Sequence, residues 1–137
     1  MYNITVLYIK YITKIDTAGT AGIRQQQRMQ FEHNRTQYIV GKSAEDNWRI
    51  IQAADKDYYW IHANNIPSTH VIICIDVEPL KEEIDYACAL CKQYTRSIST
   101  AKTPIKYIGT PIKNIKLGSK PGEVTFKTAS ACTIYTL

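Results

Sequence analysis

Short runs of hydrophobic and β-branched residues alternate with turn-forming residues along the chain, which is the pattern of strands separated by turns and helices. The first run, residues 2–12, is rich in β-branched and aromatic residues and predicts a strand. Residues 31–33 and 37–41 flank a short polar turn at residues 34–36 and predict a hairpin. Further strands are expected at residues 57–62, 70–77 and 105–108, and a closing pair of strands at residues 124–127 and 132–135.

Two segments predict helices. Ser43 is a suitable N-cap for a helix that runs from Ala44 to about Ala54, and Glu45 and Asp46 in its first turn suit the positive end of the helix dipole. A second helix is expected over roughly residues 80–97, with acidic residues near its start and basic residues near its end.

This succession of elements predicts an α+β fold. Runs of strands with two intervening helices indicate a single domain, in which a mixed, mostly antiparallel sheet carries two main helices packed on it. A length of 137 residues fits one domain. Residues 1–28 are expected to form an N-terminal extension, strand-like and then flexible at residues 17–22, and residues 29–137 to form the domain proper.

The charge is unevenly distributed along the chain. The net charge is +5, but residues 1–91 hold nine basic and eleven acidic groups, whereas residues 92–137 hold eight basic groups and only Glu123. A basic third beside a mildly acidic remainder indicates a surface patch for a polyanion, although a solvated lysine-rich face would give the same counts.

The four cysteines do not form a metal-ligand pattern. Cys88 and Cys91 have the spacing of one zinc-binding pair, but a structural site needs a second pair. Cys74 lies in an apolar run, and Cys88 and Cys91 fall on an apolar helix face, so buried free thiols are expected. Reduced thiols, Lys10 and Lys14 interrupting the first apolar run, and no apolar stretch near 18 residues together predict a cytoplasmic protein without a membrane span.

Residues 57–71 are the chemically densest stretch, because His62 and His70 flank a polar loop. A metal site would need a third ligand, for example Asp57 or His33, and the spacing gives no support for one. A pairing of Ser68 or Thr69 with His62 lacks the glycine-rich elbow of a hydrolase. Two interpretations remain ahead of catalysis: histidines that hold the loop, and a recognition site in which aromatic rings stack and loop amides meet phosphate.

Residues 118–122, Gly-Ser-Lys-Pro-Gly, have the glycines and the lysine of an anion-binding turn but not the full spacing of a phosphate loop. An ordinary solvated turn has the same composition. The loop becomes a candidate for phosphate contact because four further lysines accompany it: Lys102, Lys106, Lys113 and Lys116.

Three stretches in order carry a family resemblance: Ile39-Val-Gly-Lys42 with Asn47, then Trp60-Ile-His62 with Ile66-Pro-Ser-Thr-His70-Val-Ile72, and finally Ile105-Lys-Tyr107, Lys116 and Gly118-Ser-Lys-Pro-Gly-Glu-Val124. Together they resemble the NFACT-R domain, the predicted RNA-binding module of the NEMF/RqcH ribosome quality-control family, over about residues 29–136. The resemblance implies a non-enzymatic module that binds tRNA or ribosomal RNA in ribosome-associated quality control. The positions that match the family pattern are Gly41, Lys42, Asn47, Trp60, His62, Pro67, His70, Lys120, Pro121 and Gly122.

The sequence with this resemblance predicts an RNA-binding or ribosome-binding module with no catalytic residue, no metal and no cofactor. The residues expected to contact or shape the RNA site are Lys42, Trp60, His62, His70, Lys102, Lys106, Lys113, Lys116 and Lys120. One alternative is a small hydrolase or nuclease that uses His62 and His70. Another is a protein-interaction subunit, in which residues 1–28 add a strand to the sheet of a protein partner.

Overall fold

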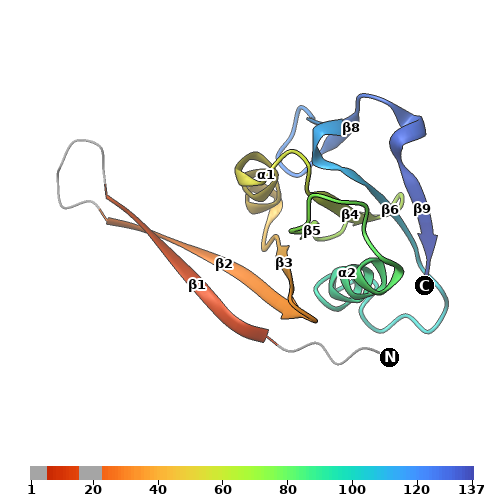
Figure 1. The fold of residues 1–137 in the computed structure, drawn as a ribbon, viewed down its shortest axis with the longest axis horizontal. Coiled ribbons are helices and arrows are strands. Elements are labelled where there is room, and N and C mark those ends of the chain that lie inside the picture. The colour runs from red at the N-terminus through yellow and green to blue at the C-terminus, as the bar shows by residue number, and fades with distance from the viewer. Residues whose placement is uncertain (1–5, 16–22) are drawn as a thin grey trace.

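The computed structural model describes residues 6–15 and 23–137, and Figure 1 shows their arrangement. The strands are β1 (Val6–Ile15), β2 (Ile23–His33), β3 (Thr36–Val40), β4 (Tyr59–Ala63), β5 (Val71–Ile73), β6 (Lys106–Pro111), β7 (Ile115–Leu117), β8 (Val124–Phe126) and β9 (Thr133–Thr136). The α-helices are α1 (Ala44–Ala53) and α2 (Lys81–Gln93), and single 3-10 turns occupy Ile112–Asn114 and Ala129–Ala131. The predicted α+β class is confirmed.

The main sheet contains seven strands in the order β1-β2-β3-β5-β4-β6-β9, and β7 and β8 form a separate two-stranded sheet. Each of the strand pairs within the described residues is antiparallel. The expected mostly antiparallel sheet is therefore confirmed. β4 lies inside the sheet between β5 and β6, which places Trp60 opposite Ile72 on one side and Thr110 on the other.

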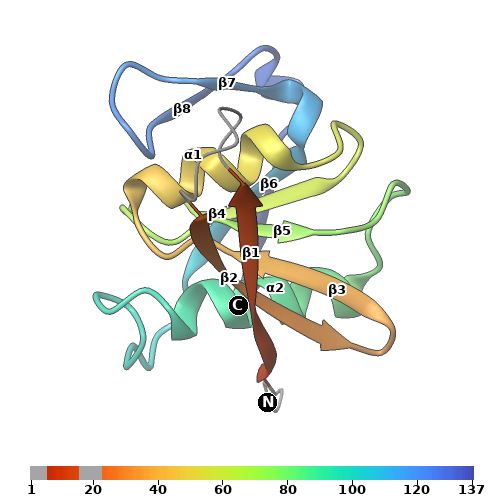
Figure 2. The same cartoon turned by 90° about the vertical axis from the view of Figure 1, so that its left-hand side faces the viewer.

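The two helices cover opposite faces of the sheet (Figure 2). Successive strand residues point to opposite faces. Trp60 and Ile72 accordingly pack with Ile50 of α1, whereas Ile61 and Ile73 pack with residues of α2. The helices are short, and within the described residues no helix has the length and apolar character needed to cross a membrane.

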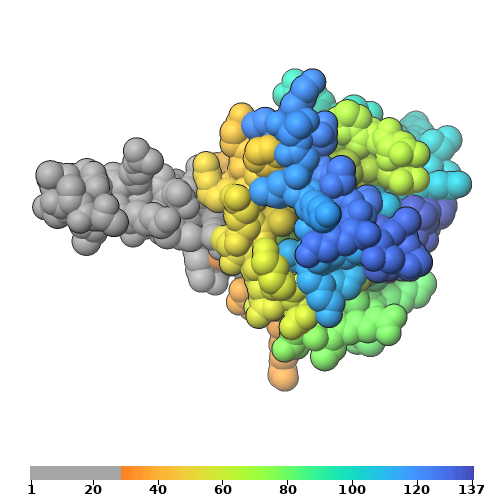
Figure 3. Space-filling view, turned by 90° about the horizontal axis from the view of Figure 1, so that it is seen from above, coloured from red at the N-terminus to blue at the C-terminus, as the bar shows by residue number. Residues whose placement is uncertain are grey.

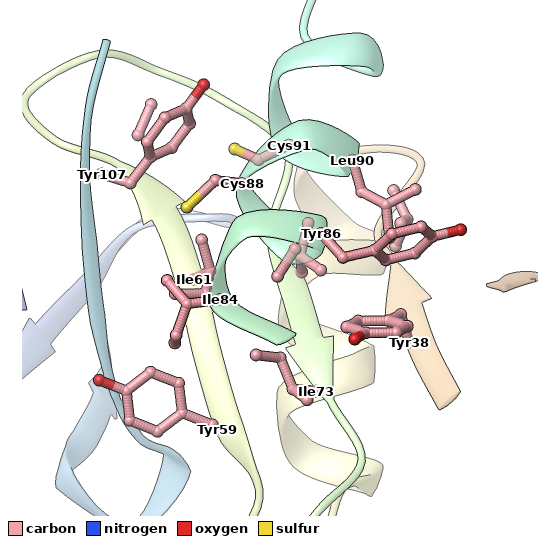
Figure 4. Close-up of a cluster of buried hydrophobic side chains, with 14 of the residues drawn as sticks. Tyr38, Tyr59, Ile61, Ile73, Ile84, Tyr86, Cys88, Leu90, Cys91 and Tyr107 are labelled. Carbon is pink, nitrogen blue, oxygen red and sulfur yellow. The ribbon is translucent and has the colours of Figure 1, made fainter. Parts of the chain in front are cut away.

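The larger part of the core lies between the sheet and α2 (Figure 4). Tyr86, Cys88 and Cys91 of α2 are at most 1% exposed and face the strands. The expectation that Cys88 and Cys91 are buried core residues is confirmed. Burial raises the pKa of the Cys91 thiol to about 11, so this thiol stays protonated at neutral pH.

Local signals in the sequence located the first turn and the first helix correctly. Asn34 and Arg35 join β2 to β3 with φ angles of 49° and 67°, the left-handed pair that a tight two-residue hairpin requires. Ser43 caps α1, because its side chain accepts a hydrogen bond from the Asp46 amide.

Three predicted boundaries or pairings were wrong. The strand expected at residues 70–77 ends at Ile73, because the Ile75 amide turns back to the Ile73 carbonyl. The helix expected over residues 80–97 ends at Gln93, where Tyr94 leaves helical geometry. The two C-terminal strands do not pair with each other: β8 pairs with β7, and β9 pairs with β6. Alternating hydrophobicity identifies a strand but not its partner.

The N-terminal part of the sheet is a long hairpin of β1 and β2 that extends from the body (Figure 1). The strand predicted at residues 2–12 corresponds to β1, although residues 2–5 lie outside the described part of the chain. The joint expected at residues 17–22 also lies outside the described residues. The division proposed at residue 28 falls inside β2, which pairs with β1 and, from Met29 onward, with β3. A protein contact through residues 1–28 stays a prediction.

Candidate functional site

A chain of buried hydrogen bonds connects β4, the loop before β5 and the loop between β7 and β8. Trp60 Nε1 donates to His70 Nδ1 over 3.1 Å, and the His70 ring also bonds the backbone of Gly122. Because Nδ1 accepts from Trp60, neutral His70 carries its proton on Nε2, which donates to the Gly122 carbonyl. Trp60 and His70 are each 1% exposed, so they position the loops from beneath and do not reach the surface.

Both histidines of this region are held in their neutral form. Burial lowers the pKa of His70 to about 3, with a further lowering by the neighbouring His62. Burial also lowers the pKa of His62, whose Nδ1 donates to the Ala63 carbonyl over 2.6 Å. The two rings meet edge to face, with centroids 4.7 Å apart. His62 is half-buried and lines the pocket described below.

The hydroxyl groups beside these histidines form hydrogen bonds with the backbone. Ser68 Oγ accepts from the Ala63 amide over 3.0 Å and donates to the Thr69 carbonyl over 3.1 Å. Thr69 Oγ1 donates to the Gly41 carbonyl. A nucleophilic hydroxyl would instead donate to a histidine ring that acts as its base. The geometry therefore gives no support to the hydrolase alternative.

Gly41 and the start of α1 lie directly against the His70 loop. The Gly41 amide donates to the His70 carbonyl over 3.0 Å, and Asn47 Oδ1 accepts from the His70 amide over 3.2 Å. A Cβ atom at Gly41 would lie 1.9 Å from Asn47 Oδ1, so a larger residue cannot occupy this position without moving Asn47. The Lys42 amide donates to Asp46 Oδ2 over 2.8 Å, and the Lys42 residue is exposed.

The β7–β8 loop closes over the same region. Gly122 has a φ angle of +84°, which favours glycine, and a Cβ atom there would lie 3.2 Å from the Ala44 Cβ. Trp48 of α1 donates from Nε1 to the Glu123 carbonyl over 2.8 Å and so ties the helix to this loop. Figure 3 shows the C-terminal segments in blue lying next to α1 in yellow.

These elements surround an open pocket of about 490 Å³. The residues that line it are Gly41, Lys42, Ser43, Ala44, Asn47, His62, Pro67, Ser68, Thr69, His70, Tyr94, Thr95, Arg96, Ser97, Pro121 and Gly122. Lys42 and Arg96 carry positive charge, and none of the lining residues is acidic. Three stretches that are far apart in the sequence, and that carry the family resemblance, thus meet around one cationic pocket.

The lysines expected to contact RNA do not form one group. Lys120 directly precedes the lining residue Pro121, and Lys116 lies on the adjacent strand β7. Lys102 and Lys106 are exposed but do not line the pocket.

Lys113 lies in a different environment. Its Nζ atom is 3.4 Å from Asp57 Oδ1, in a second depression of about 370 Å³ that also includes Asp76 and Glu78. Carboxylates repel phosphate, so this depression is unsuited to a nucleic-acid backbone. We therefore place Lys113 outside the candidate site.

Sequence reasoning missed the contribution of residues 94–97, which were expected to continue α2. Thr95 Oγ1 accepts from the Thr69 amide over 3.0 Å, and this bond fixes the chain after the helix against the His70 loop. Arg96 consequently lines the pocket. The contact joins residues 26 positions apart, so no local pattern could have predicted it.

The structure also describes the surroundings of potential metal ligands. Among residues 6–15 and 23–137, no three histidine, cysteine, aspartate or glutamate side chains cluster in a way that could hold a metal ion. His62 and His70 meet each other, but their ring nitrogens bond Ala63, Trp60 and Gly122.

The neutral, buried His70 predicts an acid-sensitive fold. Its folded pKa of about 3 lies below the value of about 6.5 expected in the unfolded chain, so the unfolded state binds the proton first. The free energy of unfolding should be highest above pH 6.5 and fall by up to about 1.4 kcal/mol per pH unit as pH drops toward 3. Urea unfolding between pH 7 and 4.5 measures this slope. A His70→Asn variant should have a shallower slope, and an unchanged slope would contradict the assignment.

Comparisons with known proteins find RqcH proteins among the relatives of this chain. No family model matches the chain. The chain is 31% identical over 91 residues to the Rqc2 homolog RqcH of Bacillus subtilis, a match that covers 64% of this chain and 15% of that protein. It is 28% identical over 94 residues to the Rqc2 homolog RqcH of Streptococcus suis, covering 68% of this chain and 17% of that protein. These similarities to RqcH proteins agree with the resemblance to the NFACT-R domain that the sequence motifs carry.

A solved structure has the same fold as this chain. It is the C-terminal part of the fibronectin/fibrinogen-binding protein from Streptococcus suis, which superposes with a TM-score of 0.69 at 24% sequence identity. The match covers 83% of this chain and 45% of that one. The matches to the RqcH proteins reach 15 to 27% of their length, so this chain corresponds to a minor part of each relative.

Proposed function

We propose that this chain is an NFACT-family domain and a non-enzymatic RNA-binding module that acts in the cytoplasm, in ribosome-associated quality control or translation. The observation that carries the proposal is the cationic pocket, because all three stretches of the family pattern line it. Its relatives are RqcH proteins, which supports a place in the same process. The RNA would be a tRNA or a ribosomal RNA that presents its phosphates to Lys42, Arg96 and Lys120.

The electrostatics of the pocket favour an anionic ligand. Lys42 and Arg96 line it without a carboxylate among the lining residues, and Lys120 extends the positive charge to its edge. Within the described residues, no ion pair engages Arg96, so its guanidinium is available for a phosphate. Arginine binds phosphate through paired hydrogen bonds, whereas lysine contributes a point charge.

The rigid floor of the pocket supports binding in preference to chemistry. Trp60, His70 and Gly122 are fixed by mutual hydrogen bonds, and His70 is neutral at pH 7 because burial lowers its pKa. A loop that is held in one shape loses little conformational entropy when a ligand binds. The arrangement therefore supports a preformed docking surface for RNA.

Salt-dependent binding of tRNA tests this proposal. With three phosphate contacts, the logarithm of the association constant should fall linearly with the logarithm of the salt concentration, with a slope of about −2 to −3. Affinity should then fall about 16- to 64-fold between 50 and 200 mM KCl. Fluorescence anisotropy of labelled tRNA, titrated with the full chain, measures the slope. Failure to bind at 50 mM KCl, or binding that does not respond to salt, would contradict the proposal.

A further inference from the structure

The pocket is larger than a phosphate contact requires. A phosphate group has five heavy atoms, and even if each took the share of a water molecule, about 30 Å³, the group would fill at most about 150 Å³. The pocket has a volume of about 490 Å³. A bound phosphate would therefore occupy less than a third of this volume, which lies in the range of small-molecule sites.

An aromatic residue is among those that line the pocket. Tyr94 lines the pocket and is half-buried. Its ring packs on Phe31 with centroids 5.4 Å apart and an interplanar angle of 48°, and Phe31 is 1% exposed. The core therefore holds the Tyr94 ring in place. A fixed aromatic ring beside positive charge is the usual combination for stacking a nucleobase whose phosphate is bound nearby.

We propose that the pocket holds one unpaired nucleotide of a single-stranded RNA segment, with its base against Tyr94 and its phosphate between Lys42 and Arg96. This inference rests on the proposed function and specifies the form of RNA that the site accepts. In a duplex the bases stack on one another and their faces are inaccessible, whereas an unpaired base can leave the strand and enter a pocket. A duplex could reach only the charged edge of this site.

The contrast between single-stranded and duplex RNA tests the inference. The probes are a labelled 12-nucleotide oligo(U) and a 12-base-pair RNA duplex, titrated with the full chain in 100 mM KCl. Charge alone would favour the duplex, because it has twice as many phosphates. We expect the opposite order, with oligo(U) bound at least about 10-fold more tightly.

Replacement of Tyr94 tests the role of the ring. Tyr94→Leu should weaken binding of oligo(U) about 5- to 30-fold, in the range measured for single stacking contacts, and leave duplex binding unchanged. Tyr94→Phe keeps the ring and should bind like the unmodified chain. Tyr58→Leu removes another half-buried tyrosine that does not line the pocket, and it is the matched control. Thermal melting verifies that each variant is folded.

The outcomes separate this inference from the proposed function. If both RNA forms bind equally and Arg96→Glu weakens both, RNA binding is supported and the single-nucleotide site is wrong. If Tyr94→Leu is folded and binds oligo(U) like the unmodified chain, the inference is also overturned. If Tyr94→Leu fails to fold, the relative affinity of the unmodified chain for oligo(U) and for the duplex still supports or overturns the single-nucleotide site. Failure to bind either RNA overturns both proposals.

Discussion

Replacement of His70 by alanine should destabilise the domain by about 3 kcal/mol. The change removes the acceptor of the buried Trp60 Nε1–H and the donor to Gly122, and it leaves a cavity in a region that is 1% exposed. An unsatisfied buried donor alone costs about 1–3 kcal/mol, and the cavity adds to this cost. Urea unfolding at pH 7 measures the loss, which corresponds to a fall in melting temperature of roughly 10 °C.

Two variants separate the hydrogen bonds of His70 from general loss of packing. His70→Asn places an oxygen near the position of Nδ1 and can still accept from Trp60, so it should recover part of the lost stability. His62→Ala removes a half-buried ring at the pocket wall and should cost about 1 kcal/mol. A His70→Ala variant within about 0.5 kcal/mol of the unmodified chain would show that the Trp60–His70–Gly122 contacts do not stabilise the loops.

The elements that depend on local signals were predictable from the sequence. The turn at Asn34 and Arg35 and the Ser43 cap each involve residues within four positions of one another. Such contacts follow from backbone preferences and short-range hydrogen bonds. The same holds for Cys88 and Cys91, whose spacing placed them on the buried face of α2.

The pairing of strands and the end of α2 were not predictable, because they depend on long-range contacts. β8 joins β7 through a short hairpin, and β9 crosses to β6, although both have similar hydrophobic patterns. The bond between Thr69 and Thr95 fixes the chain after α2 and brings Arg96 to the pocket. The conformational preferences of individual residues do not indicate which distant residue or strand each one will contact.

The candidate site was predictable in its parts but not in its geometry. The sequence named nine candidate residues, and the structure places Lys42, His62 and Lys120 among them in or beside one pocket. It did not distinguish Lys113, which forms an ion pair with Asp57 in a separate depression. Charge counts along a chain give the sign of a region and do not show which face its side chains occupy.

Reversal of the two pocket charges should have the largest effect on RNA binding. Lys42→Glu with Arg96→Glu removes two phosphate contacts and introduces repulsion where none of the lining residues is acidic. A charged hydrogen bond contributes about 1.5 kcal/mol or more, so two lost contacts lower affinity for tRNA about 100-fold. The salt slope should fall in magnitude by about 1.5 or more. Both side chains are exposed, so the melting temperature should change little.

The most direct test of the pocket as the RNA site compares this variant with one of equal charge change elsewhere. Lys56→Glu with Lys113→Glu alters two exposed lysines that do not line the pocket. The measurement is the affinity for tRNA in 100 mM KCl, by fluorescence anisotropy, for the unmodified chain and both double variants. The account predicts a loss of about 100-fold for the pocket variant and less than about 5-fold for the control. Equal losses in the two variants would contradict it, because RNA binding would then depend on net charge and not on the pocket.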